Sequence, residues 1–201
     1  MPTTASGLAA AVEVRFYALN GDHRMSAEDD AYVSEWYVPL EELADEAGLD
    51  ADDVRRLMLT NRLPLPSYIR SDGVQMVARD LLDLAGAAGG ADRLPEWFAD
   101  HWNSPRQALS EWDAYLSGQY VCLRSVTPTN MKRKDELVAA VGAALASPEP
   151  QSREWLDDIH ALVDELDALE PPFAPYDRLR FGGPVSRDRL ITAVRDQFPR
   201  A

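Results

Sequence analysis

The feature that most constrains this chain is a set of spaced residues between positions 44 and 57. Ala44 is followed after three residues by Gly48 and Leu49, and then by Val54 and Leu57. Two helices that cross at a tight turn need a small residue at the crossing, a glycine in the turn, an apolar plug after it and an apolar residue one turn into the second helix. The spacing therefore predicts a helix-turn-helix over this segment.

Signals on either side extend the segment. Pro39 favours the start of the first helix, and Asp50 is a typical N-cap for the second. The run 67–77 has the composition of a β-hairpin, with its turn at Asp72 and Gly73. A further helix is expected directly after this hairpin, over about 78–85. The segment is thus predicted to be helices with a small β-hairpin.

Over residues 38–85 the chain resembles the helix-turn-helix modules of MerR and excisionase proteins. The likeness rests on the run 63–70 with Gly73, which matches their wing, and on the run 77–81, which matches their third helix. The resemblance implies major-groove recognition by residues 51–61. The residues that would then contact DNA are Arg55, Arg56, Asn61, Arg62 and Arg70.

Helical spacing continues through the second half of the chain. We expect a short helix near Ala27 and further helices over about 92–102, 104–116, 127–145, 152–169 and 186–198. The apolar run 119–126 leans toward β structure. The predicted fold class is all-α, a helix-turn-helix module with a small β-wing packed against a C-terminal helical bundle. The expected domains are a flexible N-terminus (1–25), the module (26–90), and a helical domain (91–201) with an ordered Pro/Arg/aromatic loop over 171–185.

Charge argues against nucleic acid as the partner. The chain has 20 basic and 34 acidic residues, so its formal net charge is −14. A polyanion is attracted by clustered lysine and arginine and repelled by such an excess of carboxylates. The expected recognition helix itself begins with Asp50, Asp52 and Asp53. The charges favour a role without DNA for the module, although a homodimer could gather its arginines on one face.

Several classes of chemistry lack their motifs. Cys122 is the chain's single cysteine, which excludes an internal disulfide and a cysteine-based zinc finger. Phosphate-cradling, dinucleotide-binding and nucleophile-elbow motifs are missing, so no cofactor is expected. Asp157, His160 and Asp164 have a spacing that could bind a metal, but a solvated helix face is favoured and no metal is predicted. We expect Cys122 to be a buried inert thiol. With no membrane-length apolar run and no signal peptide visible, a cytoplasmic location is expected.

Two segments remain open to either function or packing. The run 173–187 combines aromatic residues, arginines and two glycines, which suits an anion site or a loop that wraps the core. Lys132, Arg133 and Lys134 could form a phosphate site beside Arg124. A solvated face paired with nearby acids is favoured for these three.

Three runs of sequence resemble an uncharacterised actinobacterial family that occurs beside natural-product biosynthesis genes. They are 115–128, 164–178 without Pro171, and 181–188. The resemblance would cover 28–198, and it implies a role in specialised metabolism but no particular reaction.

The leading hypothesis is a cofactor-free accessory protein that binds or converts a small-molecule pathway intermediate in a cleft between its two halves. Whether it is an enzyme stays open. If it is one, the candidate acid–base or anion-binding residues are Arg124, Tyr176, Asp177, Arg178 and Arg180. The alternatives are a pathway-specific DNA-binding regulator and a non-catalytic partner of another protein.

Overall fold

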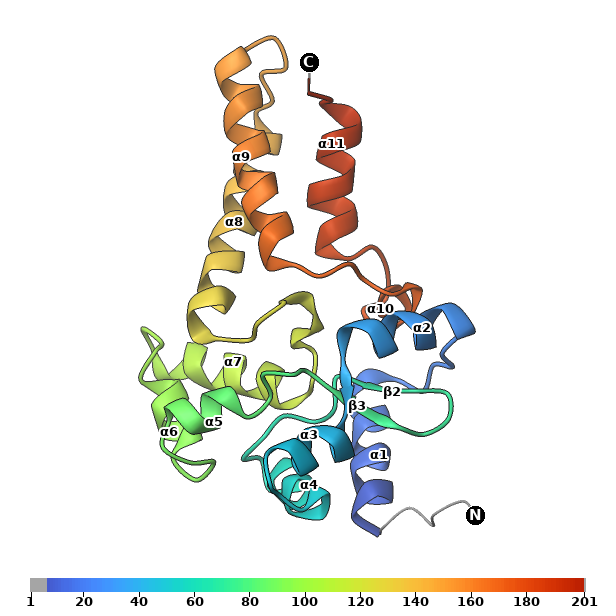
Figure 1. The fold of residues 1–201 in the computed structure, drawn as a ribbon. Helices are drawn as coiled ribbons and strands as arrows, with labels where there is room; N and C mark the ends of the chain where they lie inside the picture. Colours follow the sequence, from blue (N-terminus) through green and yellow to red (C-terminus); the bar gives the residue numbers. More distant parts are fainter. Residues whose placement is uncertain (1–6, 201) are drawn as a thin grey trace. The chain divides into compact units, whose positions relative to one another are not determined.

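The computed structural model describes residues 7–200, and its chain divides into two compact units, Met1–Val121 and Cys122–Ala201 (Figure 1). Both units are built mainly of helices, and the first also contains a small sheet. The predicted mostly helical fold with a small β-wing is confirmed. Between Gly7 and Arg200 no helix is both long enough and apolar enough to cross a membrane.

The first unit contains the following elements in chain order: α1 (Gly7–Asn20), α2 (Ala27–Trp36), β1 (Val38–Pro39), α3 (Leu40–Glu46), α4 (Ala51–Leu59), β2 (Tyr68–Ile69), β3 (Gln75–Val77), α5 (Asp83–Ala87), α6 (Leu94–Ala99), α7 (Pro105–Leu116) and the start of the 3-10 turn η1 (Tyr120–Cys122). This unit extends past the boundary expected after residue 90. The backbone N–H of Leu65 donates to the carbonyl of Leu116 at 2.9 Å, and the amide of Asn20 donates to the carbonyl of Ser117 at 3.1 Å. These bonds hold α7 in the first unit.

The expectation of a flexible N-terminus is wrong for Gly7–Asn20, which form α1; residues 1–6 of that expected segment lie outside the described residues. Val12 and Phe16 of α1 are fully buried. The sequence did not predict this helix because its polar and apolar residues are not separated onto clear faces. Packing against the rest of the fold stabilises it.

The helices expected around the Gly48 turn are present as α3 and α4. Gly48 has φ +67°, and the next N–H, of Leu49, donates to the carbonyl of Ala44 at 2.8 Å. Asp50 caps α4 by accepting a hydrogen bond from the N–H of Asp52 at 2.7 Å. The turn chemistry read from the sequence is therefore what ends one helix and begins the other.

The predicted hairpin is also confirmed. Strands β2 and β3 pair antiparallel, with Ile69 opposite Gln75, and Gly73 takes φ +83° in the turn between them. Strand β1 pairs with the other edge of β3, which gives the order β1-β3-β2. The helix expected over 78–85 is shorter and later, as α5, and the apolar run 119–126 contains η1 in place of β structure.

The second unit consists of α8 (Pro128–Ala146), α9 (Arg153–Leu169), α10 (Pro175–Arg180), the π-helix η2 (Arg187–Thr192) and α11 (Ala193–Gln197). Helices α8 and α9 lie side by side, and η2 and α11 run along them (Figure 1). Thr127 and Ser152 cap α8 and α9 through their side-chain oxygens, as their positions before the helices predict. The apolar faces enclose one core: Leu137, Val141, Ile159, Val163, Leu166, Ile191, Val194 and Phe198.

Two expectations for the C-terminal segment need correction. The region expected to be an irregular loop contains α10, which begins where Asp177 accepts a hydrogen bond from the N–H of Ala174 at 2.9 Å. Ser186, where the last helix is expected to begin and where a serine would serve as its N-cap, makes no capping hydrogen bond through its side chain. Its hydroxyl donates instead to Glu170, and the chain then enters the π-helix η2. A π-helix is rare and often marks a functional region.

Candidate functional site

Arg55, the first candidate DNA contact, is buried and serves the fold of the first unit. Its side chain is 6% exposed. Its guanidinium pairs with Glu41, donates to Asp52 at 3.0 Å and donates to Gln75 at 2.9 Å. A base contact needs an accessible guanidinium, so this geometry speaks against a DNA-reading role for Arg55.

The other candidate DNA contacts are also engaged within the first unit. Arg56 pairs with Asp53, Arg62 with Asp92 at 3.3 Å, and Arg70 with Asp72; Asn61 accepts a hydrogen bond from Arg15. Arg15 lies on α1, which packs against α4, and it also donates to the carbonyl of Leu59 at 2.9 Å. One side of the expected recognition helix is therefore covered by α1, and each candidate arginine has a carboxylate partner.

The candidate catalytic residues of the second unit mostly hold local structure. Asp177 is fully buried and caps α10, while Arg178 forms a two-pronged pair with Asp188 at 2.6 and 2.9 Å. Tyr176 is buried. The guanidinium of Arg180, itself 9% exposed, lies 5.5 Å from the ring centre of Phe181. These placements favour packing over anion binding for the run 173–187.

Arg124 lies elsewhere in the second unit. It lines a shallow depression of about 360 Å³ together with Ala168 and three charged residues, Asp164, Asp167 and Arg195. Its backbone N–H donates to the carbonyl of Leu169 at 2.9 Å, which fixes the chain before α8 against the end of α9.

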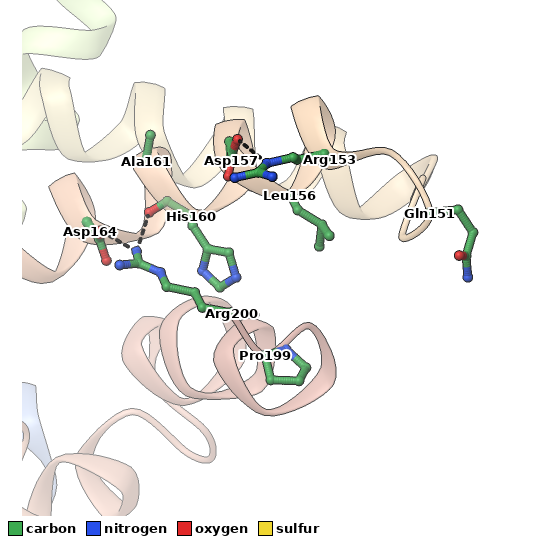
Figure 2. Close-up of a pocket in the computed structure, with 9 residues that line it drawn as sticks. All are labelled: Gln151, Arg153, Leu156, Asp157, His160, Ala161, Asp164, Pro199 and Arg200. Carbon is green, nitrogen blue, oxygen red and sulfur yellow. Dashed lines mark hydrogen bonds and ion pairs between the residues drawn. The ribbon is translucent and has the colours of Figure 1, made fainter.

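A larger groove lies along α9 and has a volume of about 630 Å³ (Figure 2). Its lining residues come from α9, from the turn before it and from the C-terminal segment: Gln151, Arg153, Leu156, Asp157, His160, Ala161, Asp164, Pro199 and Arg200. Two arginines and two aspartates give the lining a formal charge near zero. The groove therefore differs sharply from the acidic chain as a whole.

His160 is the least exposed polar group of this groove. Its residue is 6% exposed, and its Nε2 lies 2.7 Å from the carbonyl oxygen of Phe198. A carbonyl only accepts, so Nε2 carries a proton, and in the tautomer protonated at Nε2 alone Nδ1 presents a lone pair. Within residues 7–200, Nδ1 has no hydrogen-bond partner. A buried acceptor without a donor costs free energy, and it is a place where a bound molecule gains it.

A ladder of ion pairs borders the groove. Asp164 pairs with Arg195 at 3.0 Å and with Arg200, and Asp167 pairs with Arg195 at 2.8 Å and with Arg187. Hydrogen bonds from Arg200 and then Arg195 hold the pKa of Asp164 below its ordinary value. The carboxylate of Asp164 is thus already paired with two arginines. Among the described residues, no group of three carboxylate, histidine or cysteine side chains is placed to bind a metal ion.

A second polar cluster is buried in the same unit around Lys134. The ammonium lies 2.7 Å from Glu170 Oε1, 3.3 Å from Ser186 Oγ and 3.4 Å from the carbonyl of Cys122. Glu170 is fully buried; its Oε1 also accepts from the Ser186 hydroxyl, and its Oε2 lacks a partner in the described part of the chain. The ring of Phe173 lies 6.0 Å from the ammonium.

The thiol of Cys122 borders this cluster. Burial raises its pKa, although the neighbouring Lys134 opposes the shift. For Lys134 itself, burial would lower the pKa, but Cys122 and Glu170 outweigh it and the pKa is raised. The raised pKa comes from burial and disfavours the reactive thiolate, in line with the expectation of an inert Cys122.

The fold and these two clusters define a small helical protein with a ligand-sized groove in its C-terminal unit. The chain belongs to a family of unknown function, DUF6058, whose model matches residues 94–199, just over half of the chain. No curated protein and no solved structure matches the chain. The expected membership of an uncharacterised family is confirmed, and the family carries no assigned activity.

Sequence reasoning considered His160 only as a metal ligand and treated Lys134 as a solvated residue. A signal for Lys134 was present: it lies three residues after Met131 and three before Leu137, both of which are buried. A charged residue at that spacing shares the apolar face of its helix. His160 similarly follows Ile159 in a helix whose apolar face is buried.

Proposed function

We propose that this protein binds a small polar molecule in the groove along α9, with His160 Nδ1 as the buried acceptor, and that its helix-turn-helix-like segment does not read DNA. The observation that carries the proposal is the lone pair of Nδ1, buried without a donor at a groove of about 630 Å³. That volume is in the range of small-molecule sites. The proposal moves the expected site from a cleft between halves to a groove within the C-terminal unit.

The lining defines the chemistry of the ligand. Nδ1 needs a donor, so the ligand carries a hydroxyl or an amide N–H. Arg153 and Asp157 are both exposed and lie 3.8 Å apart, so each can also meet a polar group of the ligand. In keeping with the resemblance described above, we place this ligand among the intermediates of specialised metabolism.

Arg200 lies beside the His160 ring. Figure 2 shows its side chain running alongside His160, and its guanidinium is held by Asp164 and by the His160 carbonyl at 3.5 Å. Because Nδ1 is buried, a ligand reaches it only after neighbouring side chains move, and we propose that Arg200 is one of them. Arg200 and Asp164 are about half exposed, and a surface ion pair contributes only about 0–1 kcal/mol. Moving Arg200 away from Asp164 therefore costs little free energy.

Two conservative variants test the role of Nδ1. In His160→Gln the side-chain amide can still donate to the Phe198 carbonyl, but the Nδ1 acceptor is gone. In His160→Asn an oxygen replaces Nδ1, while the bond to Phe198 is lost. Nuclear magnetic resonance screening with a library of hydroxylated and amidated fragments should find binders that the asparagine variant retains and the glutamine variant loses.

His101→Gln is the matched control, because His101 lies in the first unit and bonds to the carbonyl of Trp97. Fragments that bind the unchanged chain should bind this control equally. Fragment binding that survives in a folded His160→Gln variant would show that the site lies elsewhere.

A further inference from the structure

The cluster around Lys134 is not used by the proposed groove, and its parts come from four separate segments. Lys134 lies on α8, Cys122 precedes it, Glu170 ends α9, and Ser186 begins the turn into η2. The fold thus gathers distant polar residues at one point, where a helix of uncommon geometry begins.

Within this cluster, the hydroxyl of Ser186 is the group best placed to react. Its hydroxyl donates to Oε1 of Glu170, a carboxylate that is fully buried and has an unpartnered second oxygen. Glu170 Oε1 is therefore a proton acceptor already in hydrogen-bond contact with the hydroxyl, and it shares its other contact with the Lys134 ammonium. The ammonium of Lys134, 3.3 Å from Ser186 Oγ, stabilises the alkoxide that would remain. Ser186 is the less buried member of its pair with Glu170.

We propose that Ser186 is a nucleophile for acyl groups, with Glu170 as its general base and Lys134 as the group that stabilises the charge on Oγ. A serine, a buried base in hydrogen-bond contact with it and a cation beside the oxygen are the parts that activate a hydroxyl for nucleophilic attack. The substrate class is an activated carboxylic acyl group, an ester or thioester.

The proposed step balances within these groups and water. The Oγ–H bond breaks as Glu170 Oε1 takes the proton, and Oγ forms a bond to the acyl carbon. The bond from that carbon to the leaving oxygen or sulfur then breaks, and the leaving group receives the proton from Glu170. Water then attacks the acyl carbon while Glu170 takes one of its protons, the bond from that carbon to Oγ breaks, and Oγ receives the proton from Glu170. The carboxylic acid leaves and the Ser186 hydroxyl is restored.

The test uses the full chain with two probes, a fluorophosphonate and p-nitrophenyl acetate. Mass spectrometry of the intact chain and of its peptides should show one phosphonyl or acetyl group on Ser186. Ser186→Ala should lose the adduct, and Glu170→Gln should slow labelling by about 100-fold or more, the usual size of general-base catalysis. Ser152→Ala, which removes an N-cap serine of the same unit, should label like the unchanged chain.

Circular dichroism of each variant separates lost chemistry from lost folding. If Glu170→Gln does not fold, the labelled residue in the unchanged chain decides the question without it. A folded, unchanged chain that takes no adduct on Ser186, or takes it on another serine at the same rate in Ser186→Ala, would overturn the proposal. This result would leave the groove at His160 untouched, since fragment binding there is measured separately.

Discussion

Arg55 in the first unit and Lys134 in the second are both buried cations, yet they are paired in opposite ways. The partner of Arg55, Glu41, keeps 59% of its side chain exposed, so one side of that pair stays in water. The partner of Lys134, Glu170, is fully buried, so both charges of that pair have left water. Desolvation makes the second pair the more dependent on having both members.

The two units also differ in charge. Residues 1–121 contain nine basic and 21 acidic residues, a net charge of −12, whereas residues 122–201 contain 11 and 13, a net charge of −2. The first unit thus accounts for nearly all of the chain's net negative charge. The unpartnered buried atoms discussed above, His160 Nδ1 and Glu170 Oε2, both lie in the nearly neutral unit. This difference is why both proposals place their chemistry in the second unit.

The largest expected effect comes from breaking the fully buried pair. Glu170→Ala should lower the free energy of unfolding by about 3–5 kcal/mol, because the Lys134 ammonium is left buried without its countercharge. The double variant Lys134→Met with Glu170→Leu should restore most of that loss. Urea unfolding of both variants measures it.

Asp157→Ala is the matched control in the same unit. Its pair with Arg153 is exposed and 3.8 Å long, so its loss should cost less than about 1 kcal/mol. If Glu170→Ala and Asp157→Ala lowered the free energy of unfolding equally, burial of the Lys134–Glu170 pair would not affect stability.

A smaller effect is expected from the half-solvated pair of the first unit. Arg55→Met should cost about 1–3 kcal/mol, because it leaves the buried oxygen of Gln75 without its donor while Glu41 stays hydrated. Arg56→Met, which removes an exposed pair on the same helix, should cost less than about 0.5 kcal/mol. Thermal unfolding of the two variants provides the comparison, and a costlier Arg56→Met would reverse our assignment of roles.

The smallest effect concerns acid. Hydrogen bonds from arginines hold the pKa of Asp164 and of Asp188 below its ordinary value, and both lie in the second unit. A lowered pKa in the folded chain gives stability that is present above the unfolded pKa, near 4, and is lost as the pH falls through the folded value. The second unit should therefore loosen as the pH falls below about 4.

In the first unit a hydrogen bond from Arg70 also lowers the pKa of Asp72, but protonation there relieves the repulsion of a net charge of −12 as well. Hydrogen exchange followed by mass spectrometry reports each unit separately. We expect α9 and α11 to lose protection before α4 does, and the reverse order would contradict the contrast between the units.

Much of the fold was readable because local chemistry decides it. Asp50, Ser152 and Thr127 each precede a helix and cap it, and Gly73 turns the hairpin through a positive φ. These signals act over four residues or fewer, so the sequence displays them directly. By contrast, α1 is held by the burial of Phe16 in the tertiary fold, and no local pattern announces that burial.

The candidate site was less predictable for a related reason. Arg55 and Arg178 looked like ligand contacts because an arginine's partner is invisible in the sequence when it lies 10 or more residues away. The structure pairs them with Glu41 and Asp188. His160 was visible only as a helix residue, since its missing partner is a property of the packed chain.

The central claim is that binding belongs to the groove at His160 and not to the segment 51–62. Amide chemical-shift mapping tests it, with the fragment library and, separately, a mixed-sequence DNA duplex at low salt. We predict fragment-induced shifts around Leu156, His160 and Asp164, and no duplex-induced shifts in 51–62. Duplex-induced shifts that gather on 51–62, with no fragment shifting the signals around His160, would contradict the account.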